Sequence, residues 1–294
     1  MSYADYQFIK TAQRILNEGT LIPVRPHWED GTQAQVKKIF DVHTVYDLSA
    51  GEFPALSLRP INLKAAIDEI LWIYQKKSNN INDLNSHIWD SWATSDGKIG
   101  LAYGYQIGNR FRTVTNEIKN KDGSIAVEKL QLDQMDFVLH EIKNNPTSRR
   151  IITDMYNIDD LSRMGLDPCA FLTQWNVRTD NEGRTFLDMI LYQRSQDFLV
   201  ANNWNVCQYA ALLIMVAYVN KMIPGRLTHQ IADCHIYDKH IPIVEELINR
   251  KQYHAPEYSV DMFGIESFYD FNEESIVLNN YEHNPQIKNI PVAI

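Results

Sequence analysis

The feature that most constrains the fold is the apolar stretch from Val206 to Met222, in which polar side chains are few. A helix that is hydrophobic around most of its circumference must be covered by the rest of a globular protein. Its most apolar part, residues 210–219, is too short to cross a hydrocarbon core of roughly 30 Å as a helix. The stretch therefore predicts a long helix buried at the centre of a globular fold.

Two strands are expected before this helix, at residues 170–179 and 185–194. The sequence Asp180-Asn181-Glu182-Gly183 joins them, and Asp and Gly residues between two apolar runs are typical of a hairpin turn. A second hairpin tip is expected at Lys121-Asp122-Gly123.

Three more helices are predicted from apolar residues at helical spacing and from the residues that begin or end such a pattern. The first covers residues 3–17 and ends at Gly19, the second opens at Pro60, and the third begins after Asp133 and stops before Pro146. Helices and strands do not alternate regularly, which favours an α+β fold over a doubly wound parallel sheet.

The composition is that of an ordinary globular protein, with 294 residues of which 45% are hydrophobic and 22% are charged. There is no repeat and no linker-like segment, so a single domain over residues 1–294 is expected. The net charge of -9 argues against general attraction to nucleic acid or to an anionic membrane. The first residues lack the basic and then apolar pattern of a signal peptide, and we expect a cytoplasmic location.

The three cysteines, Cys169, Cys207 and Cys234, show neither disulfide nor zinc-site spacing, and no metal site is expected. Cys169 follows Asp167-Pro168, where a strand is expected to begin. A thiol at such a place is a strong nucleophile once a nearby cation lowers its pKa. Taken alone, Cys169 is also compatible with the commoner role of a small buried apolar residue.

Polar groups of four kinds gather at the end of the second strand, from Gln193 and Arg194 to Ser195 and Asp197. An amide, a guanidinium, a hydroxyl and a carboxylate suit a ligand with a phosphate and a polar heterocycle, since Arg binds phosphate through two hydrogen bonds. Ser148-Arg149-Arg150 is a second possible phosphate site. Each pattern alone also fits a solvated strand end or a surface pair.

Glu69 lies in the apolar stripe of the second helix. Burial there raises the pKa of a carboxyl towards neutrality, which suits proton transfer, whereas a position at the edge of the stripe would leave it in water. Trp89 and Trp92 fit either an aromatic wall for a flat ligand or ordinary core packing.

Taken together, these residues resemble the thymidylate synthase family, and the resemblance extends from Arg25 to Ile294. It rests on motifs that occur in the family's order: Glu69-x-x-Trp72, Ile88-Trp89-Asp90-x-Trp92, Tyr103-Gly104, Ser148-Arg149-Arg150, Pro168-Cys169, Gln193-Arg194-Ser195-x-Asp197, Asn205, Asp233-x-His235-x-Tyr237 and the terminal Pro291-Val292-Ala293-Ile294.

The resemblance implies an α+β fold with a mixed twisted sheet flanked by helices, and a homodimer whose subunits pack sheet against sheet. It implies the reductive methylation of dUMP to dTMP, with 5,10-methylenetetrahydrofolate as both one-carbon donor and reductant. Neither a metal nor a nicotinamide is needed. In this interpretation Cys169 adds to carbon 6 of the uracil ring.

The resemblance also assigns roles to the other catalytic residues. Tyr103 helps to remove the carbon 5 proton, and Glu69 assists folate release. Asn205 faces the O4 acceptor and the N3–H donor of uracil, because a carboxamide both donates and accepts. Asp197, counted with the catalytic residues, reaches the pterin of the folate.

Substrate contacts follow in the same way. The phosphate of dUMP is held by Arg25, Arg194 and Ser195 of one subunit and by Arg149 and Arg150 of the other. Gln193 belongs to the same dUMP site, and His235 and Tyr237 hold the 3′-hydroxyl. The folate lies against Arg59, Ile88, Trp89, Trp92, Asp197, Ala201 and Ala293.

Some positions depart from the family pattern around Asn205. Ala201 and Asn203 stand where glycine and proline are usual, Ala170 where many members have histidine, and Ala232 where glycine is usual. The altered pocket wall at residues 201–204 leaves open a dUMP hydroxymethylase, which adds water to the methylene intermediate in place of hydride. A silent pyrimidine-nucleotide or RNA-binding relative is the other alternative, although the acidic chain predicts no specific nucleic-acid partner.

Overall fold

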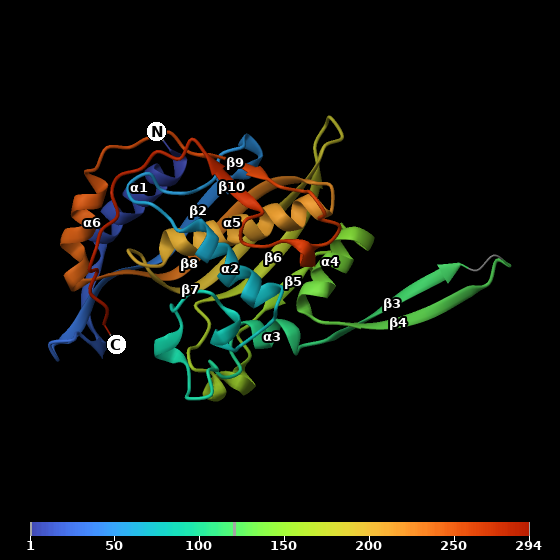
Figure 1. The fold of residues 1–294 in the computed structure, drawn as a ribbon, viewed down its shortest axis with the longest axis horizontal. Coiled ribbons are helices and arrows are strands. Elements are labelled where there is room, and N and C mark those ends of the chain that lie inside the picture. The colour runs from blue at the N-terminus through green and yellow to red at the C-terminus, as the bar shows by residue number, and fades with distance from the viewer. Residues whose placement is uncertain (1, 120–121, 294) are drawn as a thin grey trace.

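A six-stranded sheet backed by helices forms the body of the protein, and a two-stranded arm projects from it (Figure 1). The computed structural model describes residues 2–119 and 122–293. The helices are α1 (Tyr3–Glu18), α2 (Leu63–Tyr74), α3 (Gly104–Gly108), α4 (Gln134–Asn144), α5 (Asn202–Val219) and α6 (Ile241–Ile248). The strands are β1 (Thr20–His27), β2 (Gln33–Asp47), β3 (Arg112–Lys119), β4 (Ile125–Leu132), β5 (Ile152–Asp154), β6 (Ala170–Thr179), β7 (Thr185–Asp197), β8 (Ile223–Tyr237), β9 (Glu257–Val260) and β10 (Ile276–Asn279).

The large sheet has the strand order β1-β2-β8-β7-β6-β5. Its neighbours are antiparallel except for β7 and β8, which run parallel and are joined by α5. Parallel neighbours need a crossover connection, and a helix is the usual one. The register places Ser195 beside Asp233 and Asp197 beside His235, so two motifs that lie apart in the sequence meet at one end of the sheet.

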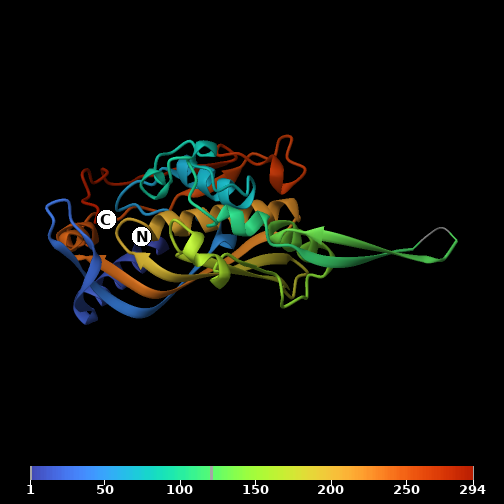
Figure 2. The ribbon, with the colours of Figure 1, turned by 90° about the horizontal axis from the view of Figure 1, so that it is seen from below.

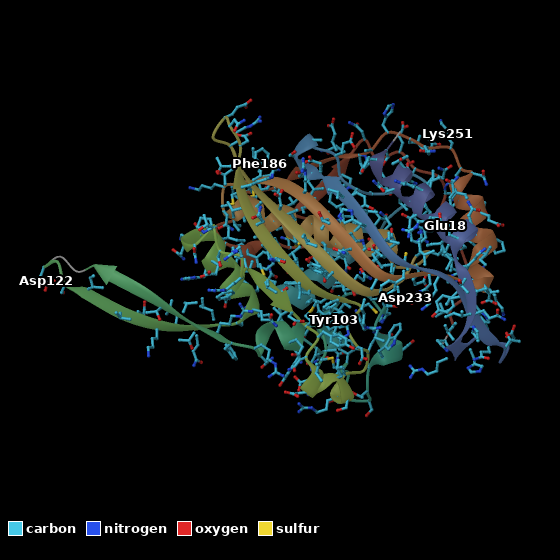
Figure 3. The ribbon with its side chains drawn as sticks, turned by 180° about the vertical axis from the view of Figure 1, so that it is seen from behind. Glu18, Tyr103, Asp122, Phe186, Asp233 and Lys251 are labelled. Atoms are coloured by element: carbon cyan, nitrogen blue, oxygen red, sulfur yellow. The ribbon has the colours of Figure 1, made fainter. Side chains whose placement is uncertain are left out.

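Helix α5 lies between the sheet and α2, with contacts to β7, β8 and α2 (Figure 2). All of its residues from Val206 to Ala217 are buried, as its largely apolar sequence predicts. Seen from behind, the strands lie in front of the helices (Figure 3). Phe40 on β2 has 74% of its surface exposed, a large apolar side chain left open on a sheet strand.

The predicted elements around the site are largely confirmed. Strand β6 has the predicted bounds, β7 extends the predicted strand to Asp197, and the turn between them contains Gly183 at a φ of 79°. Asp133 caps α4 by accepting hydrogen bonds from the backbone of Met135 and Asp136. Helix α1 ends at Glu18, with Gly19 as its C-cap.

Two boundaries are corrected. Pro60 does not open the second helix, because Asn62 caps it through the backbone N–H of Ala65 and the helix begins at Leu63. Helix α5 begins at Asn202 rather than Val206 and ends at Val219, so the first turn is built from polar residues that the apolar pattern excluded.

The arm consists of β3 and β4, which pair from Arg112 with Leu132 to Lys119 with Ile125 (Figure 1). It confirms the predicted second hairpin, although Lys121 of the expected tip lies outside the described residues. Ile125 and Val127 on β4 are 60% and 59% exposed.

Candidate active site

The thiol of Cys169 lies where β6 begins, beside the end of β7. The backbone N–H of Arg194 donates to the carbonyl of Cys169 at 2.9 Å, and Arg194 Nη2 lies 3.8 Å from Cys169 Sγ. The guanidinium is held by the carbonyls of Asp167 and Pro168, at 2.8 and 3.1 Å. The strand pairing thus brings the predicted nucleophile and a predicted phosphate ligand together.

Burial raises the pKa of the Cys169 thiol, and the positive charge of Arg194 offsets only part of this rise. Arg194 lowers the pKa of the Cys169 thiol, as expected. Burial has the larger effect, however, so the pKa in a single chain is raised overall. The thiol is the partly exposed one of the three, while Cys207 and Cys234 are buried.

Tyr103 contacts the same cysteine. Its hydroxyl oxygen accepts a hydrogen bond from the backbone N–H of Cys169 at 3.1 Å, and its ring lies 5.0 Å from that of Trp89. Burial, and next the neighbouring Cys169, raise the pKa of Tyr103 well above its ordinary value. Its φ of 46° is rare for a residue with a side chain, and strain of this kind is concentrated at functional sites.

Close packing beside Tyr103 explains why Gly104 follows it. A Cβ at position 104 would lie 2.2 Å from the carbonyl oxygen of Ser78, which is closer than real atoms approach. Only glycine fits this contact, so the Tyr103-Gly104 motif has a steric cause.

Glu69 is buried, with 7% of its surface exposed, and accepts hydrogen bonds from three side chains. Trp89 Nε1 donates to Oε1 at 2.8 Å, while Trp204 Nε1 and Gln208 Nε2 donate to Oε2 at 2.6 Å each. Burial raises the pKa of Glu69, and the three donors oppose that rise by stabilising the carboxylate. Of the two alternatives left open by the sequence, the buried carboxyl with a raised pKa is the one observed.

Asn205 lies between two glutamines, and its Nδ2 donates to Gln208 Oε1 at 3.0 Å. Its Oδ1 accepts from Gln193 Nε2 at 3.2 Å. Asn205 is therefore connected through Gln208 to the carboxylate of Glu69. The residue expected to face the base and the residue expected to transfer a proton thus belong to one hydrogen-bonded unit.

His235 and Tyr237 lie side by side at the end of β8, with ring centroids 5.5 Å apart. The Nδ1 of His235 lies 2.8 Å from Asp233 Oδ1, and Lys38 from β2 pairs with the other carboxylate oxygen. Burial opposes ionisation of Asp233, but hydrogen bonds with His235 and Lys38 outweigh it and lower its pKa. The ring of His235 is thus oriented by a charged carboxylate.

The other predicted phosphate ligands are exposed cations. Within residues 2–119 and 122–293, the guanidinium groups of Arg25, Arg149 and Arg150 make no ion pair or hydrogen bond, and all three are exposed. Gln174, further along β6 from Cys169, donates to the carbonyl of Arg149 at 3.4 Å. No hydrogen bond or ion pair joins Arg149 or Arg150 to Cys169 or Arg194 in the described part of this chain.

The predicted folate residues differ in exposure. Trp89 is buried between Glu69 and Tyr103, whereas Ile88 and Trp92 are each 40% exposed. Arg59 donates to the carbonyl oxygen of Leu199, which ties it to the turn before Ala201.

The C-terminal segment reaches the site through His240, which is 2% exposed. Its Nε2 donates to the carbonyl of Pro291 at 2.7 Å, and its Nδ1 lies 3.9 Å from Asp197 Oδ1. The described chain ends at Ala293, so the predicted terminal residue Ile294 lies outside it.

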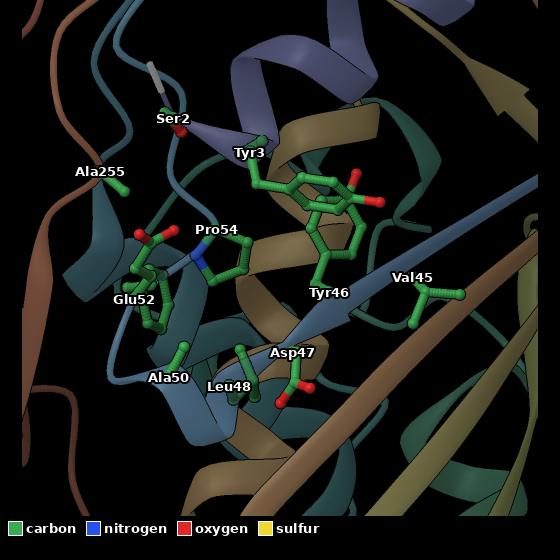
Figure 4. A pocket seen from close by; sticks show the side chains of 12 residues that line it. Ser2, Tyr3, Val45, Tyr46, Asp47, Leu48, Ala50, Glu52, Pro54 and Ala255 are labelled. Atoms are coloured by element: carbon green, nitrogen blue, oxygen red, sulfur yellow. The ribbon is translucent and has the colours of Figure 1, made fainter.

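Two cavities lie apart from these residues. One of about 320 Å³ is lined by the N-terminal end of α1, the end of β2 and Pro54 (Figure 4). Another of about 540 Å³ is lined by Arg110, Arg112 and the loop from Asp154 to Asp159. Neither contains a predicted site residue. The part of the chain that the structure describes also holds no cluster of His, Cys, Asp and Glu suited to a metal ion, and no helix long and apolar enough to span a bilayer.

The whole chain matches known proteins of one kind. The sequence profile of the family described as thymidylate synthase matches residues 6–294. Thymidylate synthase of Bacillus licheniformis is 38% identical over 294 residues, with 98% of each chain covered, and thymidylate synthase 1 of Bacillus subtilis strain 168 is 37% identical with the same coverage. The chain belongs to the thymidylate synthase family.

The structure agrees with this family. It superposes on thermostable thymidylate synthase A from Bacillus subtilis with a TM-score of 0.84 and 36% identity, covering 99% of both chains. The α+β thymidylate synthase fold is thereby confirmed. The protein is an enzyme, a methyltransferase that converts dUMP to dTMP with methylenetetrahydrofolate as co-substrate. Nothing in the comparisons favours the hydroxymethylase.

Two residues of this thymidylate synthase site were missed in the sequence. Trp204 and Gln208 both donate to Glu69, yet neither was expected to have a role. Their spacing of four residues on α5 places them on one helix face next to Asn205, and that spacing is the signal that could have indicated them.

The unusual segment before Asn205, residues 201–204, is fixed by hydrogen bonds of Asn203. Asn203, where the family usually has proline, donates to the carbonyl of Pro54 at 2.9 Å and accepts from the backbone N–H of Leu56 at 3.3 Å. The asparagine thus connects the start of α5 to the segment before α2.

Proposed function

We propose that Cys169 is the nucleophile of dTMP synthesis in this chain and that one folded domain over residues 1–294 carries the site. The observation that carries the proposal is the convergence of Cys169, Arg194, Tyr103 and the unit of Glu69 and Asn205 at one end of the sheet. A silent homologue has no chemical need for a thiol beside a cation and a phenol, with a buried carboxylate close by.

The thiolate adds to carbon 6 of dUMP, and the electron pair of the ring double bond moves towards O4. Carbon 5 then attacks the methylene carbon of the folate, and one of the two bonds from that carbon to the folate nitrogens breaks. The second of these bonds breaks when the tetrahydrofolate departs. Charge that develops on the ring oxygen needs preorganised hydrogen-bond donors, as in an oxyanion hole. Asn205 supplies such a donor through its Nδ2, whose position is fixed by Gln208.

Loss of the carbon 5 proton and departure of the tetrahydrofolate leave an exocyclic methylene, which takes a hydride from the folate. Expulsion of the Cys169 sulfur from carbon 6 then releases dTMP and dihydrofolate. Tyr103 is placed to assist removal of the proton, because its hydroxyl contacts the backbone of the nucleophile. Glu69 assists folate departure from within the same unit, since burial raises the pKa of its carboxyl and a raised pKa suits proton transfer.

The phosphate of dUMP binds to Arg194, Ser195 and Arg25 of one subunit and to Arg149 and Arg150 of a second copy. The uncovered face of the sheet and the exposed Phe40 support a homodimer that packs sheet against sheet. The exposed and unpaired guanidinium groups of Arg149 and Arg150, away from Cys169 in their own chain, support their use across the interface. His235 and Tyr237 hold the deoxyribose, and Gln193 lies behind the base.

The folate lies between the aromatic wall of Trp89, Trp92 and Ile88 and the segment from Asp197 to Ala201. Arg59 offers a positive charge near this segment, and Ala293 belongs to a C-terminal segment that closes over it. The tie between His240 and Pro291 supports this closure, because it brings that segment to within reach of Asp197. The firmly held wall around Asn203 supports reduction over hydration of the intermediate, since a dry pocket protects it from water.

Covalent trapping tests the assignment of the nucleophile. With 5-fluoro-dUMP and methylenetetrahydrofolate, fluorine replaces the carbon 5 proton, so the ternary adduct cannot proceed. We expect one stable adduct, which mass spectrometry of peptides places on Cys169. An adduct on Cys207 or Cys234, or dTMP formation by a Cys169→Ala protein, would show that another group attacks the ring.

A further inference from the structure

A histidine outside the predicted site lies directly behind it. His229 on β8 is fully buried, beside Leu191 of β7 and Thr44 of β2. Its Nε2 lies 2.7 Å from Gln193 Oε1, and its Nδ1 has no hydrogen-bond partner among the described residues. Burial lowers the pKa of His229 to about 3, so the ring is neutral and carries a single N–H.

The backbone decides which nitrogen carries that proton. Gln193 Nε2 lies 3.1 Å from the carbonyl oxygen of Ser195, and a carbonyl oxygen only accepts. The amide of Gln193 is therefore oriented with its nitrogen towards Ser195 and its oxygen towards His229. Since that oxygen must accept, the proton of His229 resides on Nε2.

The same reasoning passes along the unit to Glu69. The second N–H of Gln193 donates to Asn205 Oδ1 at 3.2 Å, which leaves Asn205 Nδ2 to donate to Gln208 Oε1 at 3.0 Å. Gln208 Nε2 then donates to the carboxylate of Glu69 at 2.6 Å. From His229 to Glu69, each residue therefore donates a hydrogen bond to the next one. Reversing a single amide would place two donors or two acceptors against each other.

This direction bears on which base Asn205 accepts. Uracil offers a donor at N3–H and an acceptor at O4, whereas cytosine offers an acceptor at N3 and a donor at its amino group. The two bases therefore need opposite orientations of the same carboxamide. An asparagine that could turn over freely would suit both, and discrimination needs one orientation to be fixed.

We propose that His229 is a positioning residue that fixes the amide orientation of Gln193, and through it that of Asn205, so that the pocket selects dUMP over dCMP. The proposal rests on the proposed role of Asn205 in facing the base. His229 itself does not touch substrate. Its N–H satisfies the one oxygen of the unit that would otherwise be buried without a donor. Loss of that donor narrows the free-energy difference between the two orientations, which then rests on the Ser195 carbonyl at this end of the unit.

The test compares His229→Leu, which removes the donor, with His229→Gln, which replaces it by an amide N–H. Leu227→Val is the matched control, because Leu227 is buried two positions away on the same face of β8. Dissociation constants of dUMP and dCMP are measured by calorimetry on the full-length protein without folate, together with the midpoint of thermal unfolding.

We expect the ratio of the dissociation constant of dCMP to that of dUMP to fall about tenfold in His229→Leu. A change of this size is typical when one buried polar group loses its hydrogen-bond partner. The ratio should recover in His229→Gln and stay unchanged in Leu227→Val. Equal weakening of both ligands in His229→Leu would show a purely structural role and overturn the proposal. If Asn205→Ala also leaves the ratio unchanged, the failure belongs to the proposed role of Asn205 and not to His229.

A measurement on the unaltered protein covers the case in which His229→Leu does not fold. Nitrogen-15 chemical shifts of the imidazole identify which ring nitrogen is protonated. A proton on Nε2 supports the directed unit, and a proton on Nδ1 overturns it, because Gln193 would then have to be reversed.

Discussion

The indole nitrogen of Trp204 lies 2.6 Å from a carboxylate oxygen of Glu69, although the two residues are 135 positions apart in the chain. Trp204 stands in the wall that departs from the family pattern, next to Asn203. This segment thus supplies a hydrogen-bond donor to the buried carboxyl. Because the donor stabilises only the ionised form, Trp204 keeps the pKa of Glu69 lower than burial alone would set it.

Replacing Trp204 by Phe should therefore raise the pKa of Glu69 further. A hydrogen bond to a charged group contributes about 1.5–3 kcal/mol, which corresponds to roughly one to two pH units. As the pH falls, the carboxylate is then protonated at a higher pH than in the wild type. The acidic limb of the plot of kcat against pH should therefore shift to higher pH. Trp175→Phe, which removes another buried indole from β6, should leave the limb in place. An unmoved limb in Trp204→Phe would show that Glu69 does not control this step.

Cys169→Ser should abolish turnover and preserve the fold. A neutral hydroxyl is a far weaker nucleophile than a thiolate, and removal of a nucleophile lowers kcat on the order of a thousandfold or more. Binding of dUMP should persist, because the arginines remain. The matched control is Cys234→Ala, since that thiol is buried in β8. Turnover near that of the wild type in Cys169→Ser, measured from the dihydrofolate absorbance, would contradict the assignment.

Mixing two inactive proteins tests the shared phosphate site. Arg149→Ala damages the site of the neighbouring subunit, whereas Cys169→Ser damages its own. In a hybrid dimer both defects fall on one site and the other site is intact. One of the two sites in each hybrid dimer should therefore be active. Subunit exchange is verified with two affinity tags. Exchange without recovery would place Arg149 in the site of its own chain.

Much of this site could be predicted because its groups lie in short local motifs. The bounds of β6 follow from a run of strand residues and the turn from Asp180 to Gly183, and Cys169 stands at its start. The first turn of α5 was missed because Asn202 and Asn203 are polar, and only tertiary contacts with residues 54–56 bury them. The 15-residue strand β8 was missed for a related reason. His229, Asp233 and His235 occupy the alternate positions at which a strand would carry apolar side chains, and they interrupt the pattern by which a strand is recognised.

Contacts between distant segments could not be predicted in this way. The meeting of Gln208 with Glu69 spans 139 positions, and that of His229 with Gln193 spans 36. Each depends on the parallel register of β7 with β8 and on the packing of α5 against α2, which no local pattern encodes. The resemblance indicated Glu69 and Asn205 separately, and only the fold showed that they belong to one hydrogen-bonded unit.

The last prediction concerns the product. Trp89 lies against Tyr103 with its ring and donates to Glu69 Oε1 at 2.8 Å. Trp89→Phe leaves that oxygen without its donor and opens space for a water molecule, since a polar oxygen in a small gap attracts one. The exocyclic methylene can then be quenched by water in competition with hydride. Chromatography of the nucleotides should show 5-hydroxymethyl-dUMP beside dTMP, with dihydrofolate formed in an amount equal to dTMP alone. Trp175→Phe should make dTMP only. If Trp89→Phe is slower but still makes only dTMP, the indole positions the folate and does not exclude water.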